Sequence, residues 1–417
     1  MEEIKMRCIT QIFEQKKIDD IPEGISKEFE KIKLSEKIKP GMQICIPVGS
    51  RGINNIQLII KSIIAEVRKR RGDPFIIPAM GSHGGANAEG QKKVLENYGI
   101  TEETMGVPIK NSMDVVELGR LENGLPVYFD KIAFEVDGII VVNRIKVHTG
   151  FKSDIESGLH KMLSVGLGNH KGASLVHYLG VRGLRDYMVE FAKVILEKTP
   201  VLCGLGILEN AYDDTYKLTA ASPGDFEKVD RELLKECKKI LPVLPVLDVD
   251  ILIVEEMGKN ISGTGMDTNV VGGIKGYKEG DYAPPRIKRI ILLDLTKETD
   301  GNALGIGLVD LITKKVYEKI DLNATYSNTI TTTFLDRARI PIVCNTEEEA
   351  FNIAMKTIWN LPGKKPRIII IRNTLKLDEL YVSENIWEEI RDRANISPLG
   401  DWEKLGFDIH GNIMLRL

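Results

Sequence analysis

Apolar and polar positions alternate along the first part of the chain in a pattern of short strands and amphipathic helices. Residues 42–48 (MQICIPV) and 74–80 (PFIIPAM) are apolar runs with the length of buried strands. After the second run, Asn87 is placed to cap a helix that Gly99 would end. Strand, loop and helix in repetition predict a parallel α/β layer. Between the two strands, residues 54–71 show helical spacing of their apolar side chains, which are Ile56, Ile59, Ile60, Ile63, Ile64 and Val67.

The same alternation continues to the middle of the chain. A hairpin is predicted around residues 122–124 (ENG), which separate two strand-like runs. Residues 138–143 (GIIVVN) are typical of a fully buried strand, and residues 184–198 form an amphipathic helical pattern. A further strand, residues 201–208, precedes a helix that would begin in the Ser-Pro-Gly-Asp sequence at 222–225.

A second α/β pattern follows a proline-rich junction at residues 241–250 (LPVLPVLDVD). We therefore predict two α/β domains with mostly parallel sheets and an active-site cleft between them. The N-terminal domain would span residues 1–245 and the C-terminal domain residues 246–417, and the tail at 406–417 could return to the N-terminal domain. The long glycine-rich loop at 258–276 is typical of a functional segment.

Composition narrows the class of partner. The chain has 417 residues with 57 Lys and Arg against 60 Asp and Glu, so a net charge of −3 gives no basic field for nucleic acid or an acidic membrane. Five cysteines without a C-x-x-C pair fit reduced thiols. The charged N-terminus has no signal-peptide core, and no run approaches the roughly 18 apolar residues of a membrane span. We expect a cytoplasmic protein that acts on a small molecule.

Three candidate side chains come shortly after predicted strands. Arg51 lies between two glycines in GSRG, His83 is flanked by glycines in GSHGG, and His148 follows the strand at 138–143. Each could be an ordinary surface loop residue. However, loops beyond the carboxyl ends of parallel strands are where ligands bind in α/β sheets, so the three loops could converge on one site. An arginine before a helix suits the binding of a carboxylate or phosphate.

The segment at residues 145–173 concentrates histidine, lysine and glycine. Its glycines loosely resemble a dinucleotide fingerprint, but the spacing differs and the preceding residues are helical in pattern. Its histidines, at 148, 160 and 170, match no common zinc-ligand spacing. Acid–base chemistry is favoured because imidazole titrates near neutrality, with lysines binding phosphate or forming a covalent attachment. A solvated basic loop is the plainer interpretation, and we prefer it for His160 and His177.

These motifs resemble, in order, those of the nickel-pincer lactate racemase family. The resemblance lies in Arg51 after a strand, GSH before a helix, and then KVHTGF, ESGLHK and GNH, between about residues 45 and 173. The final segment GFDIHGNIMLRL also resembles the tail of that family. The chain departs from the family pattern at Val48, where the family often has an acidic residue, and at Gly84, where it often has an arginine. The spacing around Lys161 also differs from that of the family.

The resemblance implies a cofactor and a site for it. In this family a nickel ion is held by a pyridinium-derived nucleotide with two sulfur arms, which is attached to a lysine. The SGLHK match makes Lys161 the attachment point, and GNH makes His170 the remaining nickel ligand. Because the spacing differs from the family, His160 and His177 stay open as alternatives to His170.

The resemblance also implies the chemistry. His83 and His148 would be acid and base on opposite faces of the substrate, and Arg51 would hold the substrate carboxylate. Abstraction of the α-proton of a 2-hydroxyacid is difficult, because the adjacent carboxylate is a poor electron sink. Removal of a hydride, with loss of the hydroxyl proton to one histidine, avoids this difficulty.

The predicted function is therefore that of a racemase or epimerase of a 2-hydroxyacid. Its partners would be the substrate and cofactor-maturation enzymes, and a homo-oligomer is compatible with the sequence. Two alternatives stay open. One is an NAD-dependent 2-hydroxyacid dehydrogenase, and the other is a ligand-binding or sensor homologue without the cofactor.

Overall fold

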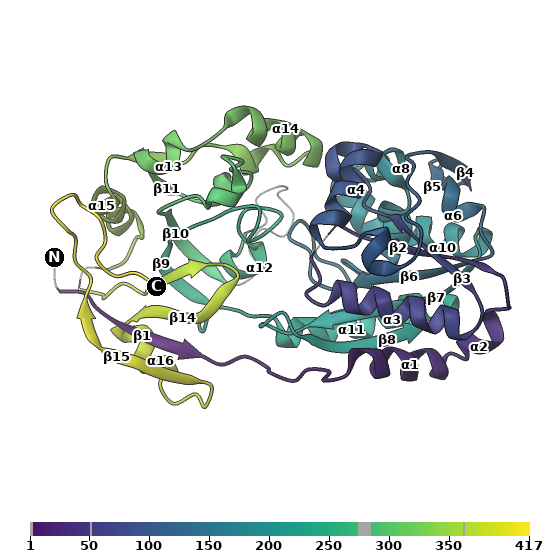
Figure 1. Ribbon diagram of the computed structural model, residues 1–417. Coiled ribbons are helices and arrows are strands. Elements are labelled where there is room, and N and C mark those ends of the chain that lie inside the picture. Colours follow the sequence, from purple (N-terminus) through teal and green to yellow (C-terminus); the bar gives the residue numbers. More distant parts are fainter. Residues whose placement is uncertain (1–2, 51, 274–284, 362) are drawn as a thin grey trace. The chain divides into compact units, whose positions relative to one another are not determined.

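The computed structural model describes residues 3–50, 52–273, 285–361 and 363–417. The chain divides into two compact units, Glu14–Leu241 and a second unit made of Met1–Phe13 together with Pro242–Leu417. Each unit contains a mixed α/β arrangement with a mostly parallel sheet (Figure 1). The predicted fold class is therefore confirmed. The interdomain cleft stays a prediction.

The unit Glu14–Leu241 is built on a five-stranded sheet in the order β3-β2-β6-β7-β8. The first four strands of this order are parallel, and β8 is antiparallel to β7. The bounds are β2 Gln43–Val48, β3 Asp73–Pro78, β6 Gly138–Arg144, β7 Val201–Glu209 and β8 Thr215–Ala221. A separate hairpin pairs β4 Val115–Arg120 with β5 Pro126–Asp130, as the turn signal predicted.

Helices cover both faces of this sheet because successive strand residues point to opposite sides. Ile44 and Ile46 pack with the apolar stripes of α1 and α3, whereas Cys45 belongs to the core under α10 and α11. The main helices are α1 Ile21–Lys31, α3 Ile56–Lys69, α4 Ala88–Asn97, α8 Asn169–Tyr178, α10 Met188–Lys198 and α11 Phe226–Ile240. Shorter helices are α2 Leu34–Lys37, α5 Glu102–Met105, α6 Lys131–Phe134, α7 Leu159–Lys161 and α9 Gly180–Arg182.

The other unit contains an eight-stranded sheet in the order β12-β11-β10-β9-β13-β14-β1-β15. The strands β12, β11, β10, β9 and β13 run parallel to one another. The last three strands in this order, β14, β1 and β15, each run antiparallel to their neighbours. The bounds are β1 Lys5–Gln11, β9 Asp248–Val254, β10 Arg286–Leu292, β11 Leu311–Thr313, β12 Ile342–Cys344, β13 Ile368–Asn373, β14 Lys376–Ser383 and β15 Ile396–Lys404. Its helices are α12 Thr268–Val271, α13 Lys314–Glu318, α14 Leu322–Thr332, α15 Glu347–Thr357 and α16 Glu384–Ile390.

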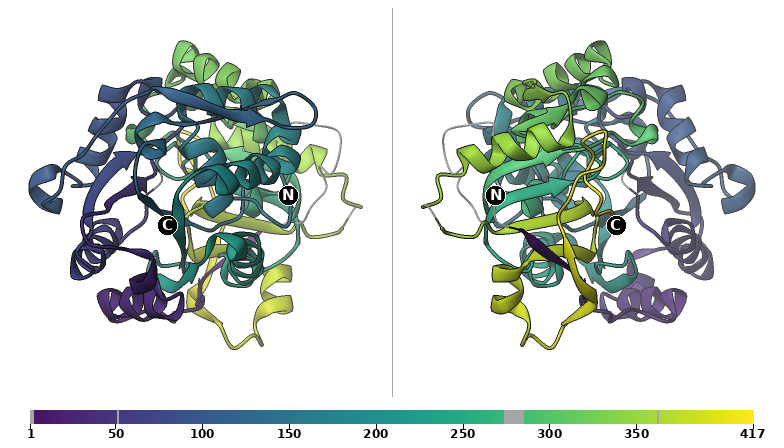
Figure 2. Two further views of the ribbon diagram at one scale, coloured as in Figure 1. Left: turned by 90° about the vertical axis from the view of Figure 1, so that its right-hand side faces the viewer. Right: turned by 90° about the vertical axis from the view of Figure 1, so that its left-hand side faces the viewer.

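The N-terminal segment corrects the predicted boundary between the domains. The sequence pattern predicts a first domain of residues 1–245, but β1 lies between β14 and β15 in the sheet of the other unit (Figure 2). Met6 and Ile9 are fully buried there, because the pairing places them against the two apolar layers of that sheet. The chain passes between the units at Phe13 and again at Leu241, close to the predicted junction.

The C-terminal tail forms hydrogen bonds and an ion pair within the C-terminal unit. The Glu347 carboxylate, 5% exposed, accepts the backbone N–H of Ile413 at 2.8 Å and is paired with Arg416. The backbone N–H of Leu417 donates to Glu255 at 2.8 Å. These contacts give the tail partners within the C-terminal unit, and the return to the N-terminal domain stays a prediction.

Candidate functional site

The loops that follow β2, β3 and β6 lie at one edge of the N-terminal sheet. β2 lies between β3 and β6 and runs parallel to both, with Val48 opposite Pro78 at the ends of β2 and β3. The carboxyl ends of these neighbouring strands therefore present Ser50, His83 and His148 on the same side. This confirms that the predicted post-strand loops share one sheet edge. Arg51, the expected carboxylate clamp, lies outside the described residues.

His83 is exposed at the end of a glycine-rich turn after β3. Its backbone N–H donates to Met80 at 3.1 Å, and its ring nitrogen Nδ1 is hydrogen-bonded to the hydroxyl of Ser50. The turn needs glycine at position 84, where φ is +64° and an added Cβ would lie 2.6 Å from the backbone nitrogen of Gln91. Tyr98 donates to the carbonyl of Ser50 at 2.6 Å, so the β2 loop that contacts the imidazole is itself anchored.

His148 is half-buried and is fixed by a buried carboxylate. Glu156, 1% exposed, accepts the backbone N–H of His148 at 2.6 Å, and its other oxygen pairs with Lys238 at 2.8 Å. The ring stacks near Phe151, with centroids 4.5 Å apart, and its Nδ1 accepts the backbone N–H of Gly150 at 2.9 Å. Backbone and imidazole are thus both held in place before any ligand binds.

Lys161 ends the short helix α7, whose start is fixed by Asp230 from α11. The Asp230 carboxylate accepts the backbone N–H groups of Leu159 at 2.9 Å and His160 at 3.0 Å, and it lies 2.7 Å from Nδ1 of the His160 ring. Gly158 is required beside it, because a Cβ there would lie 2.3 Å from the carboxylate. His160 is 2% exposed in this arrangement, so it is a buried structural histidine, and the solvated basic loop that we predicted for it is wrong.

The residues after Lys161 form a π-helical turn, Met162–Gly166, that packs against the other loops of the site. The backbone N–H of Gly81 donates to the carbonyl of Gly166 at 3.2 Å. A Cβ on Gly49 would lie 3.2 Å from the terminal methyl of Met162. Half-buried Lys161 therefore begins a segment that touches the loops after both β2 and β3, although it is remote from them in sequence.

The histidines considered as nickel ligands differ in their burial and in their contacts. Burial, together with the positive charge of Lys161, lowers the pKa of His177 from 6.5 to about 4, so this imidazole is neutral near pH 7 and close enough to Lys161 to sense its charge. His170 is exposed, and its Nδ1 lies 3.3 Å from the hydroxyl of Ser174. The charge of Lys161 thus acts on His177, whereas the sequence motif had favoured His170.

Two charged residues at this sheet edge were not singled out from the sequence. Arg144 ends β6 and pairs with Glu209 at the end of β7. Burial raises the pKa of Glu209, and Arg144 partly offsets this effect. The carboxylate also accepts the backbone N–H of Asn54 at 2.7 Å, which ties the loop after β2 to β7. In the sequence, the signal for this ion pair was the charged residue at the end of each of these two apolar strands.

The structure also bears on the dinucleotide and metal interpretations. Gly166 and Gly168 lie in and after the π-helical turn, without the strand-to-helix turn that a dinucleotide fingerprint requires. Across residues 3–50, 52–273, 285–361 and 363–417, no group of three or more His, Cys, Asp or Glu side chains could hold a metal ion. Among the helices that are described, none is long and apolar enough to cross a membrane.

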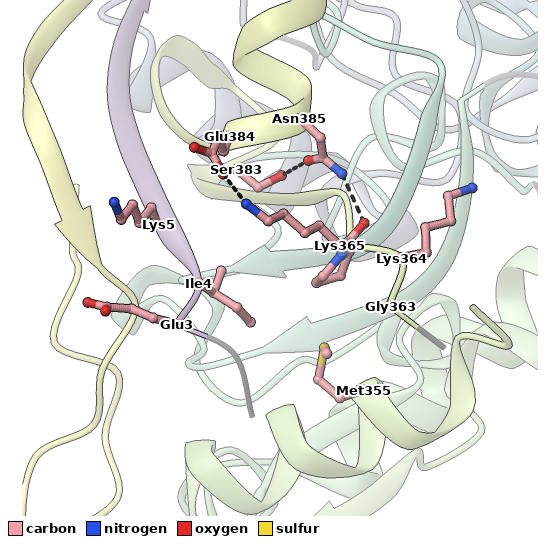
Figure 3. A pocket seen from close by; sticks show the side chains of 11 residues that line it. Glu3, Ile4, Lys5, Met355, Gly363, Lys364, Lys365, Ser383, Glu384 and Asn385 are labelled. Atoms are coloured by element: carbon pink, nitrogen blue, oxygen red, sulfur yellow. Dashed lines mark hydrogen bonds and ion pairs between the residues drawn. The ribbon is translucent and has the colours of Figure 1, made fainter. Parts of the chain in front are cut away.

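A pocket of about 300 Å³ lies in the C-terminal unit and contains none of the candidate residues (Figure 3). Lys365 there is paired with Glu384, and Asn385 donates to the Lys365 carbonyl at 3.0 Å. The lysines of this pocket are accompanied by glutamates, so it presents no uniform charge. Its lining residues are Glu3, Ile4, Lys5, Met355, Gly363, Lys364, Lys365, Pro366, Ser383, Glu384 and Asn385.

Comparisons with known proteins agree with the motif resemblance. Residues 4–180, which include every candidate site residue, match the family model for the lactate racemase N-terminal domain. The fold is similar to the lactate racemase apoprotein from Thermoanaerobacterium thermosaccharolyticum, with a TM-score of 0.56 and 14% identity over 90% of this chain and 94% of that chain. No curated protein matches the sequence.

Proposed function

We propose that this chain is an isomerase that inverts the configuration of a 2-hydroxyacid, because residues 4–180 match the family model for the lactate racemase N-terminal domain. The observation that supports this most directly is that the loops after β2 and β3 contact each other and the turn that follows Lys161. Ser50 contacts the His83 ring, and Gly81 hydrogen-bonds to Gly166. Acid–base groups and the proposed attachment lysine thus belong to one cluster of loops.

The residues around Lys161 fit the nickel-pincer nucleotide that the resemblance implies. Metals bind neutral imidazole, and burial keeps His177 neutral well below pH 7. Lys161 is near enough to influence that ring, so an amine for attachment and an imidazole for nickel occur together. Since the pincer brings its own sulfur donors, one protein ligand suffices. We therefore propose His177 as the nickel ligand, in place of His170. When bound, the cofactor would accept and return the α-hydride of the substrate.

The protein groups would orient the substrate and move its hydroxyl proton. His83 and His148 follow β3 and β6, the strands on either side of β2, and in this proposal each serves one face of a planar 2-oxoacid. Arg51, carried over from the sequence motif, would hold the carboxylate bidentately and limit release of the oxoacid. Gly84 and Val48 differ from the family pattern, which favours a 2-hydroxyacid bulkier or more polar than lactate.

The test is a panel of enantiopure 2-hydroxyacids incubated with protein produced together with cofactor-maturation enzymes. Circular dichroism should show loss of optical activity for at least one acid without net formation of NADH. Intact mass should show an adduct on the wild-type chain that is absent from Lys161→Ala. An unmodified chain that racemises a substrate would contradict the attachment, and NAD-dependent oxidation would favour the dehydrogenase alternative.

A further inference from the structure

The partner of Nδ1 determines where a neutral histidine carries its proton. The backbone N–H of Gly150 points at Nδ1 of His148 with a donor–acceptor distance of 2.9 Å. A backbone amide can only donate, so Nδ1 of His148 must offer a lone pair. Neutral His148 therefore carries its proton on Nε2 and enters any reaction as an N–H donor at that atom.

His83 has a different kind of partner. Its Nδ1 is hydrogen-bonded to the hydroxyl of Ser50, and a hydroxyl can either donate or accept. When His83 carries its proton on Nδ1 and donates to Ser50, its Nε2 has the lone pair of a base. The two histidines of the site are thus chemically different before substrate binds, because a serine hydroxyl is adaptable and a backbone amide is not.

His160 supplies an internal reference for this argument. Its Nδ1 lies 2.7 Å from the Asp230 carboxylate, which at neutral pH can only accept. Nδ1 of His160 must therefore carry a proton, in contrast to Nδ1 of His148. Fixed partners thus keep Nδ1 of His148 unprotonated and Nδ1 of His160 protonated. The hydroxyl partner of His83 is compatible with either protonation state of its Nδ1.

We propose, on the basis of the proposed function, that His83 takes the first proton from the enantiomer whose hydroxyl faces it, that Ser50 is its positioning residue, and that His148 meets the substrate oxygen as an N–H donor. In that step the substrate O–H bond would break, its proton would bind Nε2 of His83 and its electron pair would form the carbonyl, while the bound cofactor would supply the acceptor for the α-hydride. For His148 to act as the first base, its proton must move to Nδ1 and the bond from Gly150 must break.

Long-range ¹H–¹⁵N NMR spectra of the full-length, cofactor-free protein labelled at histidine test this assignment directly. Spectra are recorded above the ordinary histidine pKa of about 6.5, and His83→Gln, His148→Gln and His160→Gln variants assign the signals. We expect an unprotonated Nδ1 and a protonated Nε2 for His148, and a protonated Nδ1 for His160. A protonated Nδ1 on His148 would overturn the proposal.

Ser50→Ala and Ser50→Thr test the positioning role. Alanine removes the hydroxyl and should change the balance between the two tautomers of His83, whereas threonine keeps the hydroxyl and should preserve the wild-type spectrum. In cofactor-loaded enzyme, Ser50→Ala should lower kcat roughly tenfold to a hundredfold, in the range found for residues that orient reactive groups. His83 signals that do not respond to alanine would exclude this role.

The outcomes distinguish this inference from the proposed function. If loaded wild-type protein racemises no 2-hydroxyacid while the NMR spectra are as expected, the proposed function fails and the tautomer assignment stands. If the protein racemises its substrate while His148 carries its proton on Nδ1, the assignment of roles fails and the proposed function stands.

Discussion

Replacement of Asp230 by alanine should detach the helix turn that presents Lys161. Asp230 is 1% exposed, and its carboxylate serves the backbone N–H groups of Leu159 and His160 and the ring of His160. Hydrogen bonds to a charged group contribute about 1.5–3 kcal/mol each, and removal of one member of a buried charged pair costs about 3–5 kcal/mol. Because a single carboxylate serves all three donors, their contributions overlap, and we expect a loss of about 3–5 kcal/mol.

Hydrogen exchange measured by mass spectrometry on peptides that cover residues 155–165 is the suitable assay, because it reports this region separately from the other unit. A loss of about 3 kcal/mol corresponds to roughly a hundredfold faster exchange of the protected amides. Glu232→Ala, at an exposed position on the same helix α11, is the matched control and should change stability by less than about 0.5 kcal/mol. Unchanged exchange at residues 159 and 160 in Asp230→Ala would refute the anchoring role.

Three further predictions concern the histidines. His83→Ala and His148→Ala should each abolish racemisation while the far-ultraviolet dichroism stays unchanged, and full activity in either variant would contradict a role for both. His177→Ala should lose the nickel that purified protein retains, measured by mass spectrometry of the metal, whereas exposed His170→Ala should keep it; the reverse result would restore His170 as the ligand. The folded pKa of His177, about 4, lies below its unfolded value of 6.5, so its contribution to stability is complete above pH 6.5 and is lost as the pH falls towards 4. In His177→Gln, the free energy of unfolding measured by urea titration should lose up to about 3 kcal/mol less than in the wild type as the pH falls. An equal pH dependence in both proteins would exclude burial of a neutral His177 ring.

Much of the N-terminal unit follows from local sequence. The helix predicted at 54–71 is α3, Ile56–Lys69, because its apolar spacing matches the helical period. Asn87 caps α4 by accepting the backbone N–H of Gly90 at 2.8 Å, as its position before the helix suggested. The strands before Ser50, His83 and His148 were also predictable, since short apolar runs between turn residues have few other stable conformations.

The choice among the nickel-ligand candidates could not be made in this way. Along the sequence, Lys161 precedes and His177 follows both the π-helical turn and Asn169. The φ of Asn169 is +49°, which cannot continue a right-handed helix. A helical projection of the sequence assumes a constant helical period. It therefore assigns residues after Asn169 to the wrong faces of a helix. The effect of the Lys161 charge on His177 is a tertiary feature that motif spacing does not show.

The amino-acid sequence by itself determined much of the secondary structure, the α/β class and the loops that carry the candidate chemistry, because apolar periodicity, caps and turn residues act over a few neighbours. Tertiary structure decided which strands are adjacent, why β1 belongs to the sheet of the C-terminal unit, and which carboxylate anchors the Lys161 turn. Those choices join residues far apart in the chain, such as Arg7 with Val382 and Leu159 with Asp230. They depend on the burial of a shared core and on pairing of buried polar groups, which local sequence does not encode.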